Sequence, residues 1–313
     1  MEFSYLNRLA KDRIPFLFFC DFKGERLEAY PLDELEDAGI AFAIQQQYKG
    51  TAKKRTPLLT HPLTFDAYKQ KFDAIIEKIR AGETYIVNLT QPTPIECSLS
   101  LKEIFHIANA RYKLLVRDEF VCFSPESFVE ITADNTIHTF PMKGTIDASI
   151  KDAKERILAD PKEMAEHIMV VDLLRNDLSM VASNVRVKQL RYVEKIAAGE
   201  RELLQVSSHI SGDLQPSWRA HLGDILKQLI PAGSISGTPK RSTLAIIDEV
   251  EGYERGFFTG IFGCFDGSTL KSAVMIRFIE KHNGRYIYKS GGGITIESDA
   301  MREYKELLEK IYI

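Results

Sequence analysis

The sequence predicts an α+β fold, with antiparallel β-sheets flanked by helices, and three observations support this prediction. Stretches with strand character outnumber those with helix character, several of them are separated only by turns, and three strong helices are dispersed among them. Strands joined by tight turns pair in antiparallel fashion, whereas a parallel sheet needs a crossover between successive strands. The β-rich stretches in the second half of the chain include FVCFSPESFVEIT, FTGIFGCFDG, SAVMIRFIE and RYIYKSGGGITI.

Composition excludes several functional classes. The 313 residues are 44% hydrophobic and 27% charged with a formal net charge of -3, which gives no electrostatic footprint for nucleic acid or an anionic membrane. The longest apolar run, residues 14–20, is too short to span a bilayer and predicts a buried strand. Four cysteines without paired spacing indicate neither a disulfide framework nor a zinc site. With no signal-like segment, we expect a cytoplasmic protein.

The N-terminal region predicts a small β-rich unit. The stretch PFLFFCDFKGERLEAYPL reads as two strands joined at a turn that carries Gly24, followed by an acidic helical segment. The polar, basic stretch of residues 48–62 is the best linker candidate, and an amphipathic helix follows over about residues 66–80. We therefore expect a short segment, residues 1–60, that packs on a main domain of residues 61–313.

Two of the predicted helices carry carboxylates three residues apart. One helix has Asp160 as its N-cap, and Glu163 and Glu166 share one of its faces. The C-terminal helix, starting at Ser298, repeats the spacing with Glu303 and Glu306. A capping box explains Glu163 equally well, and solvated helix faces often carry such pairs.

If the two acidic faces met, the four carboxylates would repel each other unless a divalent cation lay between them. Oxygen ligands without a cysteine or histidine cluster favour magnesium.

Two glycine-rich stretches predict binding sites for small anions. PAGSISGTPK precedes a helix but is no phosphate-binding loop, because Pro239 precedes Lys240 and no Gly-Lys-Ser/Thr is present. SGGGITIESD is read as a second turn of this kind, in which glycines permit close backbone approach. Ordinary turn glycines are the alternative for both. Together with Arg277 and the acidic pairs, they suggest a dianionic substrate bound partly through magnesium.

Lys143 lies in the middle of the stretch FPMKGT. A lysine in a turn can simply extend into water. Alternatively, a crowded pocket desolvates the amine, which then loses its proton and acts as a nucleophile.

Six motifs together resemble the chorismate-utilising enzymes. They are EHIMVVDLLRNDLS, PAGSISGTPK, RGFFTGIFG, MIRF, GGGITIESD and EYKELLEK, in the family's order, within residues 64–313. The resemblance implies two facing antiparallel sheets with helices outside and a magnesium-bound chorismate between them. Residues 61–313 would then form the chorismate-binding catalytic domain.

Within that family, the KGT at Lys143 resembles the aminodeoxychorismate synthases, because other members typically have alanine at this turn. The resemblance implies that Lys143 attacks carbon 2 of chorismate, that the hydroxyl on carbon 4 departs, and that ammonia adds at carbon 4 and expels the lysine. Glu126, in an SPE motif, matches the acid that protonates the leaving hydroxyl. The product is 4-amino-4-deoxychorismate, on the route to 4-aminobenzoate and folate.

The resemblance also assigns binding roles. Glu166 and Glu306 would hold Mg²⁺, with Glu163 and Glu303 supporting them. The implied substrate-binding residues are Thr145, Gln205, Ser236, Gly237, Lys240, Arg277, Gly292, Gly293 and Lys310.

Three positions depart from the family pattern. Gln205 stands where most members have histidine, Phe258 where they have tyrosine, and Ile86 where hydroxylating members have a water-activating lysine. Isoleucine cannot activate water, which disfavours water addition. Glutamine can hydrogen-bond but cannot act as an acid or base.

No glutaminase module is recognisable, because a Gly-x-Cys-x-Gly nucleophile elbow is missing. We therefore expect free ammonia or a separate glutamine amidotransferase subunit as the nitrogen source. Anthranilate synthase component I and a non-catalytic chorismate-binding subunit remain as alternatives.

Overall fold

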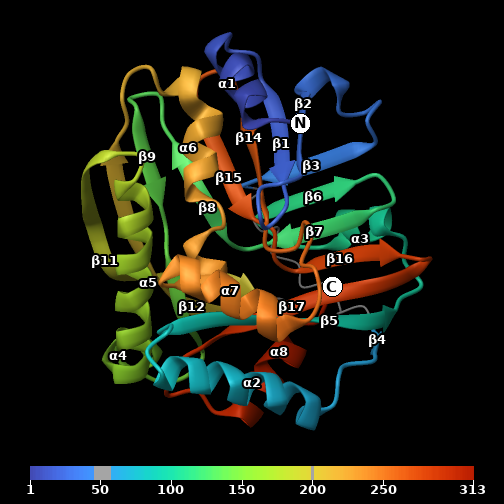
Figure 1. Cartoon of the computed structure of the whole chain (residues 1–313), viewed down its shortest axis with the longest axis vertical. Helices are drawn as coiled ribbons and strands as arrows, with labels where there is room; N and C mark the ends of the chain where they lie inside the picture. Colours follow the sequence, from blue (N-terminus) through green and yellow to red (C-terminus); the bar gives the residue numbers. More distant parts are fainter. Residues whose placement is uncertain (46–57, 199–200) are drawn as a thin grey trace.

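The computed structural model describes residues 1–45, 58–198 and 201–313, and these residues form two antiparallel sheets with helices outside them (Figure 1). This confirms the predicted α+β class. In the described residues the first sheet has nine strands, in the order β10 (Met142–Asp147), β12 (Arg201–Asp213), β9 (Thr136–Thr139), β8 (Ser127–Ile131), β15 (Leu270–Val274), β14 (Ile261–Phe265), β1 (Phe16–Cys20) and β2 (Leu27–Pro31), with β11 (Ser183–Ala198) also paired to β12.

The second sheet has eight strands in the same described part of the chain. Their order is β13 (Gly237–Thr238), β5 (Ile86–Glu96), β17 (Arg285–Ile294), β16 (Phe278–His282), β7 (Phe120–Ser124), β6 (Tyr112–Val116) and β3 (Ile40–Ile44), with β4 (Leu59–Thr60) also paired to β5.

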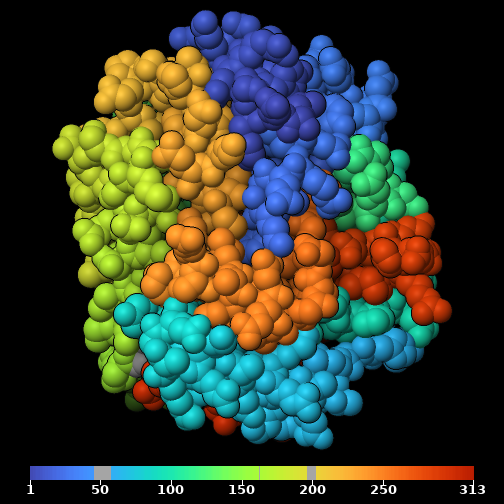
Figure 2. Space-filling model, viewed as in Figure 1, coloured from blue at the N-terminus to red at the C-terminus, as the bar shows by residue number. Residues whose placement is uncertain are grey.

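Helices surround these sheets (Figure 1). They are α1 (Phe3–Lys11), α2 (Phe65–Arg80), α3 (Leu101–Ile107), α4 (Ala153–Ala159), α5 (Pro161–Ser179), α6 (Leu222–Leu229), α7 (Lys240–Glu251) and α8 (Ala300–Glu309). Figure 2 shows that α1, α6, α5, α7 and α2 form much of the surface on one side of the molecule. Short 3-10 turns are found at Leu32–Glu34, Trp218–His221 and Gly233–Ile235.

Strand β1 is buried on both faces and links two parts of the core. Because side chains alternate along a strand, Leu17 and Phe19 pack between the two sheets, and Phe19 meets Phe120 of β7 with ring centroids 6.0 Å apart. Phe16 and Phe18, on the other face, belong to the core beneath α1 and α6. This explains why the apolar run predicted as a buried strand has no polar residue.

Local signals in the sequence place the helix boundaries well. The helix predicted over about residues 66–80 is α2, and Thr64 caps it by accepting a hydrogen bond from the Ala67 N–H. The predicted cap of α5 is confirmed, because Asp160 accepts a hydrogen bond from the Glu163 N–H. The predicted start of α8 is off by one residue, since Asp299 and not Ser298 caps this helix through the Arg302 N–H.

The two N-terminal strands are confirmed as β1 and β2, which pair in antiparallel fashion. The predicted acidic helix is wrong, because only the 3-10 turn Leu32–Glu34 forms there. The predicted linker falls mostly outside the described residues. Strands β1 and β2 join the first sheet and β3 joins the second, while the boundary near residue 60 stays a prediction. Among the described helices, none is long and apolar enough to cross a membrane.

A buried ion pair fastens the end of α7 to β5. Glu251 and Arg255 are both 2% exposed, and the Arg255 Nη2 lies 2.6 Å from the Glu251 Oε1. The same carboxylate oxygen accepts hydrogen bonds from the N–H and hydroxyl of Thr90, at 2.8 and 2.7 Å. Arg255 also donates to the carbonyls of Asn88 and Ile235. The network therefore holds β5 and the loop before β13 in fixed relation.

Replacing Glu251 with glutamine should lower the free energy of unfolding by about 3 kcal/mol, because it leaves the buried Arg255 charge uncompensated. Glu249→Gln is the matched control on the same helix: Glu249 is 63% exposed and pairs with Lys78, so its loss should cost less than about 1 kcal/mol. Urea unfolding of both variants measures the difference, and equal losses would contradict the assigned role of the buried pair.

Candidate active site

Lys143 lies in a β-bulge at the edge of the first sheet. The register pairs Met142 with Ser207 and Thr145 with Gln205, so Lys143 and Gly144 together stand opposite one residue of β12. Such a bulge redirects a side chain from the regular alternation of a strand. Gly144 has φ +86°, and a Cβ at this position would lie 2.9 Å from the Glu163 Oε2, so the bulge requires glycine.

The Lys143 amine forms an ion pair with α5. Its Nζ lies 2.8 Å from the Oε2 of Glu166, whose side chain is 9% exposed. Burial lowers the pKa of Lys143, as predicted, but the carboxylates of Glu166, Glu306 and Glu163 together outweigh it and raise the pKa. The expectation that desolvation alone supplies a neutral amine is therefore wrong for this arrangement, because the same helices that bury the lysine surround it with negative charge.

A second lysine, Lys310, lies at the end of α8. Its Nζ is 2.9 Å from the Oε1 of Glu306 and donates to the Gly291 carbonyl at 2.8 Å. Here burial dominates, and the positive charges of Arg277 and Lys143 add to it, so the pKa of Lys310 is lowered despite Glu306. The two lysines therefore have opposite pKa shifts.

The glycine run between these lysines is a strand and not the predicted turn. Gly291, Gly292 and Gly293 lie in β17 and pair with residues of β5, so they belong to a sheet and not to a turn before a helix. Close approach is the reason for glycine at Gly291, where a Cβ would lie 2.6 Å from the Thr90 Cγ2. A Cβ at Gly292 would lie 3.6 Å from the Lys310 Nζ, and one at Gly293 would lie 3.9 Å from the Lys143 Nζ, so both amines lie beside this strand at ordinary contact distance.

The acidic pairs of α5 and α8 both face this region. Glu163 lies against Gly144, Glu166 pairs with Lys143, and Glu306 pairs with Lys310. Glu303 is 8% exposed, and its Oε2 lies 3.7 Å from the position of a Cβ at Gly292. The spacing of each pair thus has the predicted consequence that both acidic faces turn toward the interior site.

In the described part of the chain, no group of three or more histidine, cysteine or acidic side chains is close enough to hold a metal ion. Magnesium nevertheless keeps several waters and commonly uses one or two carboxylates together with oxygens of its substrate, so a closed cage is not needed. The oxygen-only donors of the two helices suit this ion.

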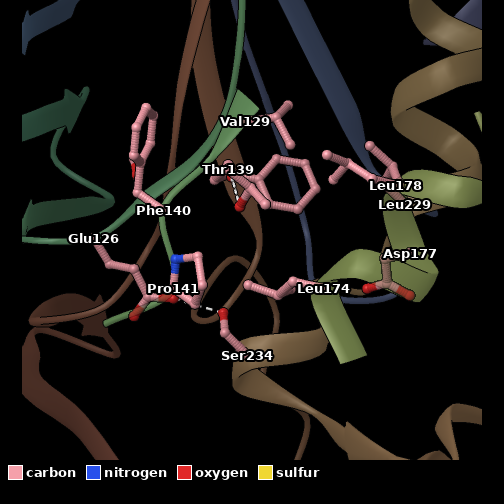
Figure 3. Close-up of a pocket in the computed structure, with 12 residues that line it drawn as sticks. Glu126, Val129, Thr139, Phe140, Pro141, Leu174, Asp177, Leu178, Leu229 and Ser234 are labelled. Atoms are coloured by element: carbon pink, nitrogen blue, oxygen red, sulfur yellow. Dashed lines mark hydrogen bonds between the residues drawn. The ribbon is translucent and has the colours of Figure 1, made fainter. Parts of the chain in front are cut away.

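Glu126 lies in the turn between β7 and β8, where its carboxylate accepts a 2.5 Å hydrogen bond from the Ser234 hydroxyl (Figure 3). Burial raises the pKa of Glu126, although the positive charges of Arg277, Lys310 and Lys143 oppose it. A carboxyl group with a raised pKa can keep its proton near neutral pH, as an acid catalyst requires.

A small cavity adjoins Glu126. Glu126 and Asp177 lie at opposite ends of it (Figure 3), and its volume of about 20 Å³ is enough for a water molecule. Asp177 forms an ion pair with Lys240 at 3.1 Å, and Lys240 also donates to the Leu229 carbonyl at 3.3 Å. Lys240, predicted as a substrate-binding residue, is thus engaged with the wall of this cavity.

Arg277, in the turn between β15 and β16, contacts the C-terminal residues. Its Nε donates to the Tyr312 hydroxyl at 3.2 Å. Its positive charge is also among the influences that lower the pKa of Glu126. The structure thus places Arg277 and Lys310 as cations on the Glu126 side of the site.

Two predicted substrate-binding residues fix the loop before α7. The Ser236 hydroxyl is buried and donates to the Ala232 carbonyl at 2.9 Å. Gly237 has φ +135°, and a Cβ there would lie 1.9 Å from the Ile86 carbonyl oxygen. Both residues hold β13 against β5.

The remaining predicted positions lie in three places. Thr145 and Gln205 are cross-strand neighbours next to the bulge. Ile86 places its Cδ1 3.3 Å from the position of a Cβ at Gly293, and so it presents an aliphatic group beside the lysine. Phe258 is 2% exposed and packs on Phe278 in the core between the sheets.

Sequence reasoning missed four groups at the site: Ser234, Tyr312, His167 and Ser208. His167 is fully buried on α5, and its Nε2 lies 2.7 Å from the Ser208 Oγ. Its position four residues after Glu163 places it on the acidic face, which is a signal that the sequence does contain. Ser234 and Tyr312 have no comparable signal, because their partners are far away along the chain.

Comparison with known proteins gives a consistent result. A family model described as chorismate binding enzyme matches residues 16–313. A Haemophilus influenzae protein described as an uncharacterised PabA-like protein is 48% identical over 310 residues, covering 98% of this chain and 94% of that protein. Aminodeoxychorismate synthase component 1 of Bacillus subtilis is 31% identical over 266 residues, covering 80% of this chain and 55% of that enzyme.

Among solved structures, anthranilate synthase component I from Streptococcus pneumoniae superposes with a TM-score of 0.69 at 26% identity, covering 84% of this chain and 60% of that one. The relatives with stated activities thus include more than one reaction.

Replacing Gly144 with alanine should impair the site, because the new Cβ would collide with Glu163 in a backbone conformation that alanine rarely adopts. We expect a loss of about 2 kcal/mol in the free energy of unfolding. Gly284→Ala is the control, since Gly284 has φ +76° with nothing within 4 Å of a Cβ, and it should cost about 1 kcal/mol. Chemical denaturation compares the two, and equal effects would show that the contact with Glu163 contributes nothing.

Proposed function

The chain belongs to the family of chorismate-binding enzymes, and we propose that it aminates chorismate at carbon 4 to give 4-amino-4-deoxychorismate. The observation that carries this proposal is the position of the Lys143 amine. The bulge in β10 directs its Nζ toward the Glu166 Oε2, 2.8 Å away, beside the glycines of β17. A primary amine at this position offers a nucleophile once it is neutral.

Lys143 and Glu126 have separate roles in the proposed reaction. Lys143 forms a bond to carbon 2 of the ring, the double bonds shift, and the hydroxyl on carbon 4 leaves as water with a proton from Glu126. Ammonia then adds at carbon 4 and the bond between carbon 2 and Lys143 breaks. The raised pKa of Glu126 supports its role as the acid, and its hydrogen bond to Ser234 fixes the carboxyl group.

Glu166 and Glu306 would hold Mg²⁺, with Glu163 and Glu303 supporting them. Bound there, the ion would supply positive charge that orients a substrate carboxylate and neutralises the acidic side chains around Lys143. Burial would then be the main remaining influence on the amine, and burial lowers the pKa of Lys143. Lys143 would act as a nucleophile only in its neutral form.

The surroundings of the lysine also restrict the reaction. Ile86 offers no group that could take a proton from water, which supports amination over hydroxylation. Arg277 and Lys310 would bind the substrate carboxylates. Ammonia would come from solution or from a separate glutamine amidotransferase subunit, and the product would serve 4-aminobenzoate and folate synthesis.

The purified chain, given chorismate, ammonium and magnesium, should form 4-amino-4-deoxychorismate without releasing pyruvate, as followed by product mass. Lys143→Ala should abolish this, and so should Lys143→Arg, which keeps a positive charge opposite Glu166 but cannot become a neutral nucleophile. Anthranilate with pyruvate would favour anthranilate synthase instead. Substantial turnover by either variant, or unchanged chorismate with the wild-type chain, would contradict the proposal.

Removing one metal-binding carboxylate should weaken magnesium binding together with amination. We expect Glu166→Gln and Glu306→Gln each to raise the apparent Kd for Mg²⁺ about 10-fold or more, measured by calorimetric titration in the presence of chorismate. Asp172→Asn is the control, because Asp172 lies on the same helix as Glu166 but pairs with the exposed Arg175. If both glutamine variants bind magnesium as the wild type does, Glu166 and Glu306 are not metal ligands.

A further inference from the structure

Arg277 lies in a turn that is bonded to the segment carrying Glu126. The Phe123 N–H, near the end of β7, donates to the Arg277 carbonyl at 3.0 Å. The Val274 N–H, at the end of β15, donates to the Glu126 carbonyl at 3.2 Å. Arg277 also has φ +54°, a left-handed conformation that is costly for a residue with a side chain and is found mostly where function requires it. The backbone thus fixes where the Arg277 side chain begins, and Tyr312 contacts its far end.

Tyr312 contacts the guanidinium group of Arg277 in two ways. Its hydroxyl oxygen accepts a hydrogen bond from the Arg277 Nε at 3.2 Å, and its ring centroid lies 5.5 Å from the Arg277 Cζ. Because the guanidinium is planar, a fixed Nε sets the direction of both Nη groups. Among the described residues, no other group accepts a hydrogen bond from this guanidinium, so Nη1 and Nη2 are left for a ligand.

The segment after α8 holds Tyr312 in place. The isoleucines before and after Tyr312 pack against a buried cluster that includes Tyr288 of β17, while the Tyr312 side chain contacts Arg277. Tyr288 is fully buried, and its hydroxyl donates to the carbonyls of Lys310 at 2.9 Å and Tyr312 at 3.3 Å. A single buried hydroxyl therefore fixes the backbone that carries both Lys310 and the partner of Arg277.

We propose that Tyr312 is a positioning residue for the binding of a substrate with two carboxylates. Its hydroxyl holds Nε of Arg277, so that Nη1 and Nη2 meet one carboxylate as a fixed pair of donors. Without this contact, the guanidinium is ordered only when the substrate binds, and that cost weakens binding. Tyr312 itself touches no substrate in this role. The part of Arg277 in substrate binding rests on the proposed function, whereas the hold of Tyr312 on Arg277 does not.

Two tyrosine variants isolate this contact. Tyr312→Phe removes the hydroxyl that accepts from Arg277 and keeps the ring and the backbone anchor. Tyr286→Phe is the matched control, because Tyr286 lies on β17 against the same buried cluster but pairs with Lys281, toward the end of β16 remote from Arg277. Thermal melting checks that both variants fold.

Calorimetric titration with chorismate and magnesium, without ammonium, gives the first result. We expect Kd to rise about 5-fold in Tyr312→Phe and to stay within about 2-fold in Tyr286→Phe. Arg277→Lys keeps the charge but has no planar fork to orient, so adding Tyr312→Phe to it should change Kd by less than about 2-fold. Unchanged affinity in Tyr312→Phe, an equal loss in Tyr286→Phe, or the full loss in the Arg277→Lys background would overturn the proposal.

The second result needs no substrate. Phenylglyoxal modifies guanidinium groups, and its rate at Arg277 is followed by mass spectrometry of the peptide. We expect this rate to be about 3-fold higher in Tyr312→Phe than in the wild type or Tyr286→Phe, because a guanidinium that is no longer held is exposed more often. Equal rates in all three proteins would overturn the proposal even if chorismate binds. If the wild type binds no chorismate, the proposed function fails and takes the substrate part of this role with it, while the modification rates still decide whether Tyr312 holds Arg277.

Discussion

The amine of Lys143 and the carboxylate of Glu166 lie 2.8 Å apart in a space that Glu163, Glu303 and Glu306 also face. Burying the Glu166 carboxylate alone would be costly, and its burial is tolerated because the Lys143 amine accompanies it. The fold is arranged to maintain this balance. Helices α5 and α8 contribute the acids, while β10 at the edge of the first sheet and the end of α8 contribute the amines. Disturbing one charge therefore affects the protonation of the others.

The three titratable groups proposed for binding and catalysis differ because their neighbours differ. Lys143 and Lys310 are both partly buried, yet the pKa of Lys143 is raised and that of Lys310 lowered, since more carboxylate charge surrounds the first and two cations lie near the second. Burial raises the pKa of Glu126 and outweighs the opposing effects of the Ser234 hydrogen bond and of the cations Arg277, Lys310 and Lys143. Environment, and not residue type, thus gives an acid with a raised pKa and two amines whose pKa values shift in opposite directions.

Features with local signals could be predicted from the sequence, and those that depend on distant partners could not. The boundaries of α2 and α5 follow from caps and apolar spacing, and the acidic faces follow from helical geometry. The run of glycines from Gly291 was misread as a turn, because glycine has no strand propensity and pairing with β5 decides its conformation. The bulge at Lys143 depends on its register with β12, and the charge of its amine depends on helices from two separate parts of the chain.

The glycines of β17 limit how substitutions can change this site. A Cβ at Gly291 would lie 2.6 Å from the Thr90 Cγ2 and 2.7 Å from the Leu89 carbonyl oxygen, so no side chain can be introduced there without displacing its neighbours. This point of the site is thereby closed to change by substitution. New selectivity must arise elsewhere, at positions such as Ile86 on β5 and Gln205 on β12 whose side chains can vary. A fixed stretch of backbone beside variable positions allows several reactions to share a single way of holding the ring.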